Sequence, residues 1–507
     1  MKRALVLAVL LAEPAAAEWR VAETAHFRVY AELPEKDLRR RAEVLEDFRD
    51  MLGTFSSAKV ADDVPRLDVY IVGNISAAVP FGRIAPTVGG FYSAGDGGIA
   101  AYSIDGDFGR RALLHEYAHH HMFASTGLSY PAWYVEGFAE YFMTATFQPG
   151  RIDFGLPDPG RVQSLVYGNW LSWEKLVDPG ARRRRDDAAM FYAQSWLLTH
   201  YLFRTPGMAE KNRAYLTAVA RGEPALAAFK AHVHPDPAAL GRTLERYVRS
   251  SKFTYSRYTR PEAKPAAVTI TPLPPSADAM LMMYAALERG AAALPAEDRP
   301  AALAKVRAAA ARFPGDDLAA RTLAMAELAL GSPAAALAQI DALLARRPAD
   351  PQLQRLKAQA LLQIGGPDAV PAARRLLVQV ARAVPNDWRA LHIYLHTYDI
   401  VHTRVPQSVA DVVQRAWELA PQVDGLTIDM AAMLVQRDRL PEAAQVLAPV
   451  AFEPHNGQYS ALARALRSAA LAGDKAGFVK ALDAGPAAAI AAEEAGDGED
   501  AGRRAGA

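Results

Sequence analysis

The second half of the chain repeats a proline-containing segment at a nearly constant interval. Pro314, Pro348, Pro385, Pro421 and Pro454 follow one another at distances of 34, 37, 36 and 33 residues. The sequence between them is rich in Ala and Leu at helical spacing, with a short break once per unit such as Gly-Ser-Pro or Gly-Gly-Pro. Each unit therefore predicts two helices. Units of this kind stack, because a single helical hairpin cannot bury its own apolar face.

The length and content of these units resemble tetratricopeptide repeats. The resemblance implies an all-α array of about six helix pairs over residues 277–485, with a concave face that binds a protein segment. Trp388, Tyr394 and His396 are candidates for that face. A passive spacer would show the same period, so both interpretations stay open. The low-complexity residues 486–507 are expected to form a disordered tail.

The first half has a different pattern and predicts an α+β domain over residues 18–255. Residues 26–32 and 66–73 alternate like strands, and residues 35–52 between them have helical spacing. Residues 88–103 predict a hairpin around the turn Ala-Gly-Asp-Gly-Gly. Further helices are expected at residues 109–123, 131–144, 188–203, 211–220 and 237–250. Five prolines in residues 256–276 predict an extended linker to the repeats.

Composition excludes several classes of protein. A chain of 507 residues is too long for one small core, which favours two or three domains. Its 57 Lys and Arg balance 56 Asp and Glu, so charge gives no reason to expect a nucleic-acid partner. The chain has no cysteine. Disulfides, thiolate metal sites and a cysteine nucleophile are excluded, and any metal must be held by histidine and carboxylate.

The N-terminus has the pattern of an export signal. Lys2 and Arg3 precede the apolar residues 4–12, and the small residues 15–17 follow. We expect residues 1–17 to be removed and the protein to be exported to a bacterial periplasm or secreted. An uncleaved N-terminal anchor is the alternative. No later stretch reaches the ~20 uninterrupted apolar residues of a transmembrane helix.

The sequence His115-Glu116-Tyr-Ala-His119 lies within a predicted helix. The spacing of four residues places both imidazoles on one face, one turn apart, where they can reach a single ion. Glu116 is displaced around the helix and can contact a water on that ion without being a ligand. Zinc suits this arrangement, because three protein ligands leave one position open for water beside a carboxylate base. His120 and His121 point away from this face and are not expected to be ligands.

A second helix carries two carboxylates four residues apart in the segment Trp-Tyr-Val-Glu136-Gly-Phe-Ala-Glu140-Tyr. Glu136 follows His119 by seventeen positions. One carboxylate can complete a His, His, Glu site, and the other can accept a hydrogen bond from a ligand histidine. Ordinary polar residues on two helices are the alternative.

Together these two segments resemble the gluzincin metallopeptidases, and most closely the peptidase-MA-like group. The resemblance covers about residues 20–255 and implies an α+β zincin-like catalytic domain. It makes Glu136 the third zinc ligand and Glu140 the acid that holds a ligand histidine. It also implies a zinc-dependent peptidase in which Glu116 takes a proton from zinc-bound water and passes it to the leaving amine.

The resemblance suggests two further roles. In gluzincins an edge strand just before the HExxH helix binds the substrate backbone, which here points to the strand residues Ile99, Ala100, Ala101 and Tyr102. A plain core hairpin is the alternative. An oxyanion donor often comes from a later helix, which points to Tyr192, with Gln194 as the other candidate. Tyr192 could equally be a core aromatic.

The rival to a peptidase is a non-catalytic envelope scaffold, in which the repeats recruit protein partners and the zinc fold is structural. A peptide or protein substrate is the partner that the first hypothesis implies. His392 and His396, with His402 nearby, have ligand spacing but no acidic residue inside the pair, which favours packing or hydrogen bonding. The run Arg182 to Arg185 predicts a solvated loop.

Overall fold

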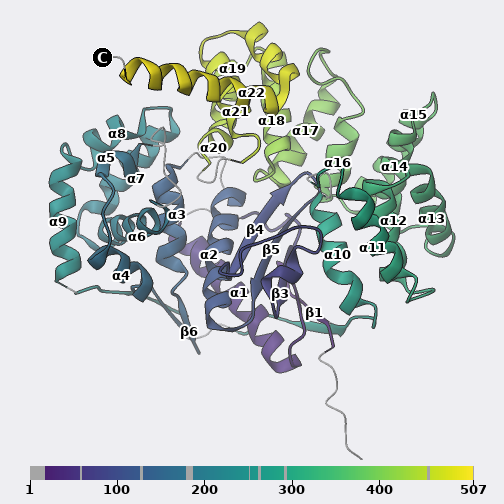
Figure 1. Cartoon of the computed structure of the whole chain (residues 1–507), viewed down its shortest axis with the longest axis horizontal. Coiled ribbons are helices and arrows are strands. Elements are labelled where there is room, and N and C mark those ends of the chain that lie inside the picture. Colours follow the sequence, from purple (N-terminus) through teal and green to yellow (C-terminus); the bar gives the residue numbers. More distant parts are fainter. Residues whose placement is uncertain are drawn as a thin grey trace, which may run out of the picture.

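The computed structural model describes residues 18–56, 60–125, 130–178, 187–250, 252–260, 264–290, 294–453 and 457–505. The expected signal segment 1–17, the arginine run 182–185 and Pro454 lie outside these residues. The chain folds into an N-terminal region of mixed strands and helices and a C-terminal region built of helices (Figure 1).

The N-terminal region contains a six-stranded sheet in the order β4-β5-β3-β2-β1-β9. The neighbours β2, β3 and β5 run parallel, whereas β4, β1 and β9 are antiparallel to their neighbours. The strands are β1 (Arg20–Glu23), β2 (Phe27–Ala31), β3 (Leu67–Val72), β4 (Gly90–Gly95), β5 (Gly98–Ile104) and β9 (Thr269–Pro272). The expected hairpin at residues 88–103 is present as the antiparallel pair β4 and β5.

Helices cover both faces of this sheet. Alternate residues of a strand point to opposite sides, and here both sets include apolar side chains that need to be buried. On one face Val69 and Ile71 of β3 join a large core with α1 (Glu35–Phe55) and α2 (Gly106–Ser125). On the other face Tyr70 and Val72 pack with α10 (Ala277–Gly290). The turn η1 (Ile75–Ala78) borders this second face. The sheet is thus buried on both sides, as its strong apolar content requires.

A helical lobe continues the larger core beyond α2. It contains α3 (Ala132–Phe142), α4 (Pro159–Tyr167), α5 (Trp173–Val177), α6 (Ala188–Arg204), α7 (Met208–Ala220), α8 (Ala225–His232) and α9 (Pro237–Arg249). A small antiparallel sheet of β6 (Thr146–Gln148), β7 (Arg151–Phe154) and β8 (Ser256–Thr259) lies beside it. The helix α3 is buried along its whole length.

The expected extended linker at residues 256–276 is extended, but it contributes one strand to each of the two sheets instead of only connecting two domains. Its first strand, β8, pairs with β7, and its second, β9, pairs with β1. Both are edge strands. Proline is tolerated at a sheet edge because the missing N–H is not needed there. The N-terminal region therefore extends past residue 255.

The C-terminal region is helical and places the repeated prolines between helices, as the period predicts. Pro314 lies between α11 and α12, Pro348 between α13 and α14, Pro385 between α15 and α16, and Pro421 between α17 and α18. The helices are α11 (Arg299–Ala310), α12 (Asp317–Leu330), α13 (Pro333–Arg346), α14 (Pro351–Ile364), α15 (Ala369–Ala383), α16 (Trp388–Leu395), α17 (Gln407–Leu419), α18 (Asp424–Gln436), α19 (Leu440–Val446), α20 (Ala448–Ala451), α21 (Ser460–Leu471) and α22 (Lys475–Ala505).

The first three repeated segments share an N-cap. Asp316, Asp350 and Asp387 each stand two residues after the proline and accept a hydrogen bond from a backbone N–H in the first turn of the next helix. This is the usual role of an N-cap aspartate. In the fourth segment Val423 occupies the cap position without a side-chain bond, and Asp424 is displaced by one residue into the helix.

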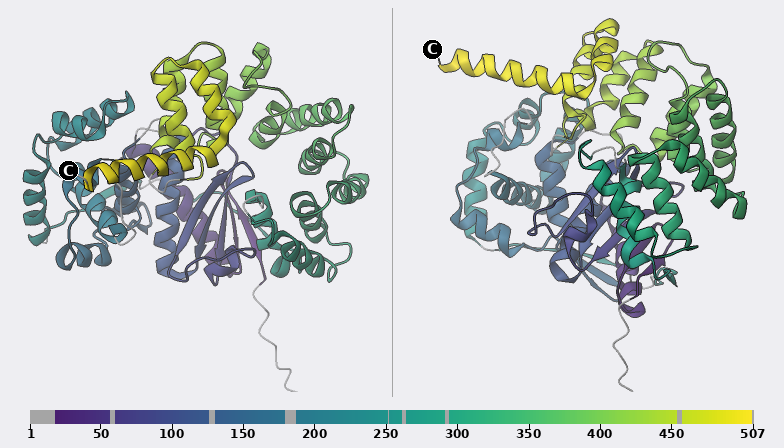
Figure 2. Two further views of the ribbon diagram at one scale, coloured as in Figure 1. Left: turned by 45° about the horizontal axis from the view of Figure 1, so that its top comes forward. Right: turned by 45° about the vertical axis from the view of Figure 1, so that its right-hand side comes forward.

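The helical array begins against the sheet and curves round to lie over its β4 edge (Figures 1 and 2). The tip of the hairpin between β4 and β5 contacts two helices of the array, α10 and α18. A Cβ on Gly97 would meet the α10 backbone at 2.5 Å, and one on Gly425 of α18 would meet Asp96 at 2.3 Å. Asp63 also pairs with Arg415 of α17 at 2.6 Å. The two regions therefore form one packed body.

Three residues were expected on a protein-binding face of the array. Trp388 is 2% exposed and belongs to the core, which corrects that expectation. The hydroxyl of Tyr394 contacts that of Tyr398 at 3.1 Å, and His396 bonds to Asp429.

The C-terminal segment is helical to Ala505, where a disordered tail was expected. α22 breaks at Gly485, whose φ is 76° and ψ 178°, and resumes at Pro486. Proline suits the first turn after such a break, and the alanines that follow have the highest helix propensity.

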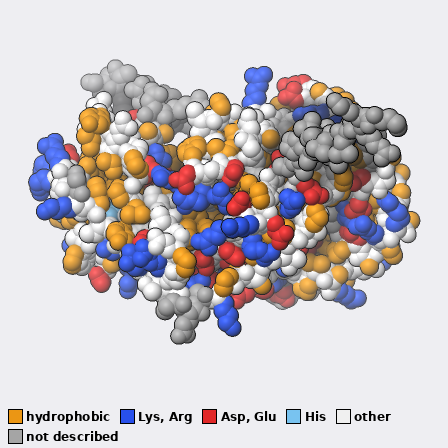
Figure 3. Space-filling view, turned by 90° about the horizontal axis from the view of Figure 1, so that it is seen from below, with side chains coloured by type: hydrophobic (Ala, Val, Ile, Leu, Met, Phe, Trp, Pro, Cys, Tyr) orange, Lys and Arg blue, Asp and Glu red, His pale blue; other side chains and the backbone are white. Residues whose placement is uncertain are grey.

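The face seen from below shows Lys and Arg side chains beside Asp and Glu side chains, with hydrophobic residues between them (Figure 3). This mixture agrees with the net charge of +1. Within the described residues, no helix combines the length and the apolar character needed to cross a membrane.

Candidate metal centre

Two histidines of α2 face the same point from successive turns. His115 and His119 lie four residues apart, and their Nε2 atoms are 3.0 Å apart. Their rings are nearly perpendicular, with centroids 4.6 Å apart. The predicted helix and its i, i+4 spacing thus bring both nitrogens together.

The buried helix α3 brings two carboxylates to this point. Glu136 and Glu140 are both 0% exposed. A carboxylate removed from water costs several kcal/mol unless positive charge or hydrogen bonds compensate it. Each of these two side chains therefore needs a cationic partner inside the protein.

The three donor atoms have the separations that zinc requires. Oε2 of Glu136 lies 3.4 Å from Nε2 of His115 and 3.5 Å from Nε2 of His119. A tetrahedral ion with bonds of about 2.0–2.1 Å holds its ligand atoms about 3.3 Å apart. Two imidazole nitrogens and a carboxylate oxygen are also the donors that zinc prefers. The residues present therefore fit a zinc ion.

Glu140 lies behind the site and is held by an arginine that the sequence did not indicate. Arg161, in the first turn of α4, donates from Nε and Nη2 to the two oxygens of Glu140, both at 2.7 Å. Oε1 of Glu140 is also 3.5 Å from Nδ1 of His115. The expected contact between Glu140 and a ligand histidine is present, with a bidentate ion pair fixing the carboxylate.

The charges around His115 favour its protonated form when no metal is bound. Burial opposes that form, but the hydrogen bond to Glu136 and the charges of Glu140 and Glu116 outweigh it and raise the pKa of His115 to about 9. A divalent cation would take the place of this proton among the same carboxylates.

Glu116 points toward the edge of the sheet. Its Oε2 accepts a hydrogen bond of 3.1 Å from the backbone N–H of Tyr92 in β4. This N–H points away from β5 toward α2, so the carboxylate lies along the unpaired side of β4.

The expected substrate strand is wrong in its position. The residues named for it, Ile99, Ala100, Ala101 and Tyr102, belong to β5, which pairs with β4 on one side and β3 on the other. Their backbone groups are used inside the sheet and cannot add a further strand. The edge strand beside the histidines is β4.

Tyr192 of α6 lies next to the histidine pair. Its ring centroid is 6.3 Å from that of His115. Burial and the charges of Glu136, Glu140 and Glu116 raise its pKa. The hydroxyl is therefore protonated at neutral pH and can act as a donor.

The alternative donor, Gln194, is occupied elsewhere. Its side chain is buried, accepts from the backbone N–H of Leu171 at 2.7 Å and donates to the backbone oxygen of the same residue at 3.1 Å. This excludes it from the site.

His120 and His121 lie outside the cluster. His120 contacts the hydroxyl of Tyr92 at 3.0 Å and His121 the hydroxyl of Ser56 at 2.9 Å. The prediction that these two residues are not part of the site agrees with this placement.

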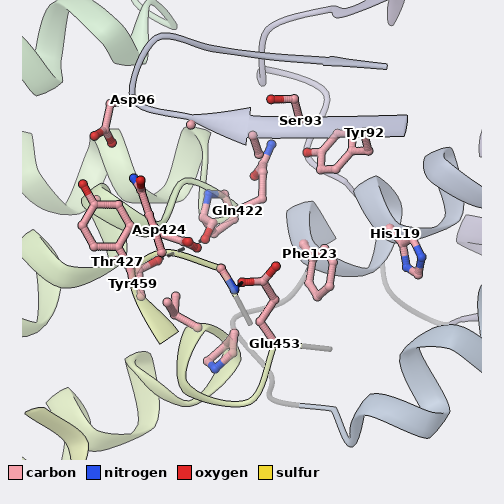
Figure 4. A pocket seen from close by; sticks show the side chains of 18 of the residues that line it. Tyr92, Ser93, Asp96, His119, Phe123, Gln422, Asp424, Thr427, Glu453 and Tyr459 are labelled. Carbon is pink, nitrogen blue, oxygen red and sulfur yellow. Dashed lines mark hydrogen bonds between the residues drawn. The ribbon is translucent and has the colours of Figure 1, made fainter. Parts of the chain in front are cut away.

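A cavity of about 360 Å³ opens beside the centre. One wall comes from the N-terminal region and includes Glu116. Tyr92 and Ser93 of β4, with His119 and Phe123 of α2, belong to the same wall (Figure 4). The other comes from the helices α17 to α20 of the array and from the loops around them. Cavities of this size accommodate small ligands or a few peptide residues. Sequence reasoning missed this second wall entirely.

The cavity is lined by several acidic and hydrogen-bonding groups, most of them from the array. Asp424, Glu453 and Asp96 line the cavity together with Gln422 and Tyr459 (Figure 4). Burial and the charges of Glu453 and Asp96 raise the pKa of Asp424 to about 8. Asp424 is the residue displaced from the N-cap position in the fourth repeat, so its carboxylate is available to the cavity.

Comparison with protein-family models gave no match, and neither did comparison with curated proteins or with solved structures. The assignment of a function to this chain therefore rests on the residues and their geometry.

Proposed function

We propose that this protein is an exported zinc-dependent peptidase of the gluzincin type. In this proposal residues 18–255, completed by β9, form a zincin-like catalytic domain, and residues 277–485 form a tetratricopeptide-like array. The observation that carries the proposal is the set of donor separations, 3.0, 3.4 and 3.5 Å, among His115, His119 and Glu136. The placement of Glu116 beside both the donors and the cavity supports a catalytic rather than a purely structural ion.

When bound, zinc would supply Lewis acidity toward a water molecule and toward the scissile carbonyl. Glu116 accepts the proton of that water at its carboxylate and passes it to the leaving nitrogen. The hydroxyl of Tyr192 donates a hydrogen bond to the carbonyl oxygen that becomes negative. Arg161 and Glu140 hold the ring of His115 in place.

The edge strand β4 positions the substrate. An extended peptide can add to its unpaired side, where the N–H of Tyr92 meets Glu116. The peptide would then lie in the cavity, between the histidines and the wall of the array. In this arrangement the array takes part in binding the substrate, and a separate protein partner remains a prediction.

The test combines metal analysis with a peptide-library digest of the purified protein. Glu116→Gln should keep zinc and reduce turnover by about 10²–10⁴-fold, because only the general base is removed. His115→Ala and Glu136→Ala should lose most of the zinc. Glu210→Gln, an exposed residue of α7, is the matched control and should behave as wild type.

Three results would count against the proposal. Full zinc occupancy in Glu136→Ala would show that Glu136 is not the third ligand. Peptide cleavage that survives unchanged in Glu116→Gln would exclude the mechanism, and zinc binding without any cleavage by the wild type would favour the non-catalytic scaffold.

A further inference from the structure

A second cluster of metal-ligating side chains lies in the helical array. His392 of α16 and His396, which follows that helix, meet Asp429 of α18. Oδ2 of Asp429 is 3.2 Å from Nε2 of His392 and 2.9 Å from Nε2 of His396. The three ligand atoms lie within 4.8 Å of one another.

The histidine pair has nearly the same geometry as the pair in the candidate catalytic centre. The ring centroids of His392 and His396 are 4.5 Å apart with an angle of 79° between the planes. The corresponding values for His115 and His119 are 4.6 Å and 86°. In both pairs one carboxylate from a neighbouring helix faces the two Nε2 atoms at a distance close to the ~3.3 Å between ligands of tetrahedral zinc.

The surroundings suit an ion that enters from solvent. The side chain of His392 is 8% exposed and that of Asp429 15%, whereas that of His396 is 56% exposed. A largely buried carboxylate requires a positive partner, and the exposed imidazole leaves a path for a hydrated cation. Three donors leave one position for water, the coordination that zinc accepts.

The chemistry differs from that of the first centre in one respect. Between the two histidines stand Ile393, Tyr394 and Leu395, so no carboxylate lies within this pair as Glu116 does within the first. An ion here would connect α16 to α18 without catalysing a reaction. The helix α18 also carries Asp424 and Thr427 to the cavity, and its Gly425 packs on the hairpin tip.

We propose that His392, His396 and Asp429 form a second site for a zinc-like divalent cation, which fixes α18 and with it the far wall of the cavity. This proposal does not require the catalytic role of the first centre. Its sequence signal is incomplete, because the third ligand lies 33 residues after His396, in another helix.

The test is the number of zinc ions bound by the metal-stripped full chain, titrated with Zn²⁺ alone. The wild type should bind two ions. In His396→Gln the affinity of the second site should fall at least about tenfold, so that one ion binds at the Zn²⁺ concentrations that saturate the wild type. Because His396 is half exposed, this variant should keep its fold, which circular dichroism checks. His402→Gln is the matched control, since His402 contacts Asp399 and Asp483 outside the cluster, and it should bind two.

His115→Ala separates this proposal from the proposed function. If both proposals hold, His115→Ala binds one ion and the double variant with His396→Gln binds none. If only the second site binds metal, the wild type binds one ion, which His396→Gln removes. A His396→Gln protein that binds as much zinc as wild type, with the same affinities, would overturn the second site.

Discussion

Gly137 lies where α3 crosses α6 too closely for any side chain. A Cβ at this position would be 2.2 Å from Oγ1 of Thr199 and 2.4 Å from the backbone oxygen of Ser195. The threonine side chain can rotate away, but the Ser195 carbonyl belongs to a helix backbone. In Gly137→Ala the two helices must therefore separate by at least about half an ångström.

This displacement should reduce both stability and metal affinity. Overpacking of a buried contact typically costs about 1–3 kcal/mol of the free energy of unfolding. Glu136 is the preceding residue, so its carboxylate moves with the helix relative to the two histidines. Ligand distances at a metal site tolerate only about ±0.2 Å, and we expect the zinc affinity to fall by about 10–100-fold.

Urea denaturation measures the first effect, and competition with a chromophoric chelator measures the second. Gly73→Ala is the matched control, because a Cβ at Gly73 has no neighbour within 4 Å. Its free energy of unfolding should stay within about 0.5 kcal/mol of wild type. If Gly137→Ala kept wild-type stability and zinc affinity, the close packing of α3 on α6 would not be what positions Glu136.

Three further predictions follow from the site and its surroundings. Tyr192→Phe should lower kcat by about 10²–10³-fold with unchanged zinc content, and wild-type kcat would return this residue to a packing role. Burial raises the pKa of Asp424 to about 8, so the cavity gains negative charge as the pH rises from 7 to 9. Over this range kcat/KM for a cationic peptide, relative to that for a neutral peptide, should rise about tenfold. A rise that persists in Asp424→Asn would contradict this prediction. Burial lowers the pKa of His200 to about 4, so between pH 6.5 and 4 the imidazole is protonated in the unfolded chain but not in the folded protein. The free energy of unfolding should therefore fall by about 3 kcal/mol as the pH falls through this range. Urea titrations of His200→Gln should lack that part of the loss.

The local elements of the site could be predicted because their signals are local. Helical spacing around His115 and His119 predicts one shared face, and the same period in the next helix places Glu136 and Glu140 together. The short reach of these side chains leaves few ways for the two helices to meet. The expected contacts among these residues are those of the structure.

The order of the two hairpin strands could not be predicted, because it depends on tertiary packing. Both β4 and β5 are short, β-prone and joined by the same turn, so the sequence does not indicate which of them joins β3. The backbone pairing of β5 with β3 determines that β4 is at the edge. The same reason applies to residues 256–276, where prolines disfavour a helix but leave edge strands allowed.

The cavity wall shows most clearly where the sequence is insufficient. Asp424 and Glu453 meet Asp96 from more than 300 residues away, and no period connects them. One local sign exists. Three repeats place aspartate at the N-cap, whereas the fourth has Val423 there and the acid one residue later. Where a residue departs from a repeated capping pattern, we expect it to serve something other than the helix.

The packing of the array on the sheet determines how its role can be tested. A chain ending near residue 255 would lose β9 from the sheet and α10 from one of its faces, and would expose the buried Tyr70 and Tyr102. Lost activity in such a fragment would report unfolding and would say nothing about substrate binding. Substitutions within α18, which leave both sheets and their covering helices intact, are therefore the informative perturbation. The array forms one wall of the cavity, and its position is fixed because the hairpin tip that carries Asp96 is held between α10 and α18.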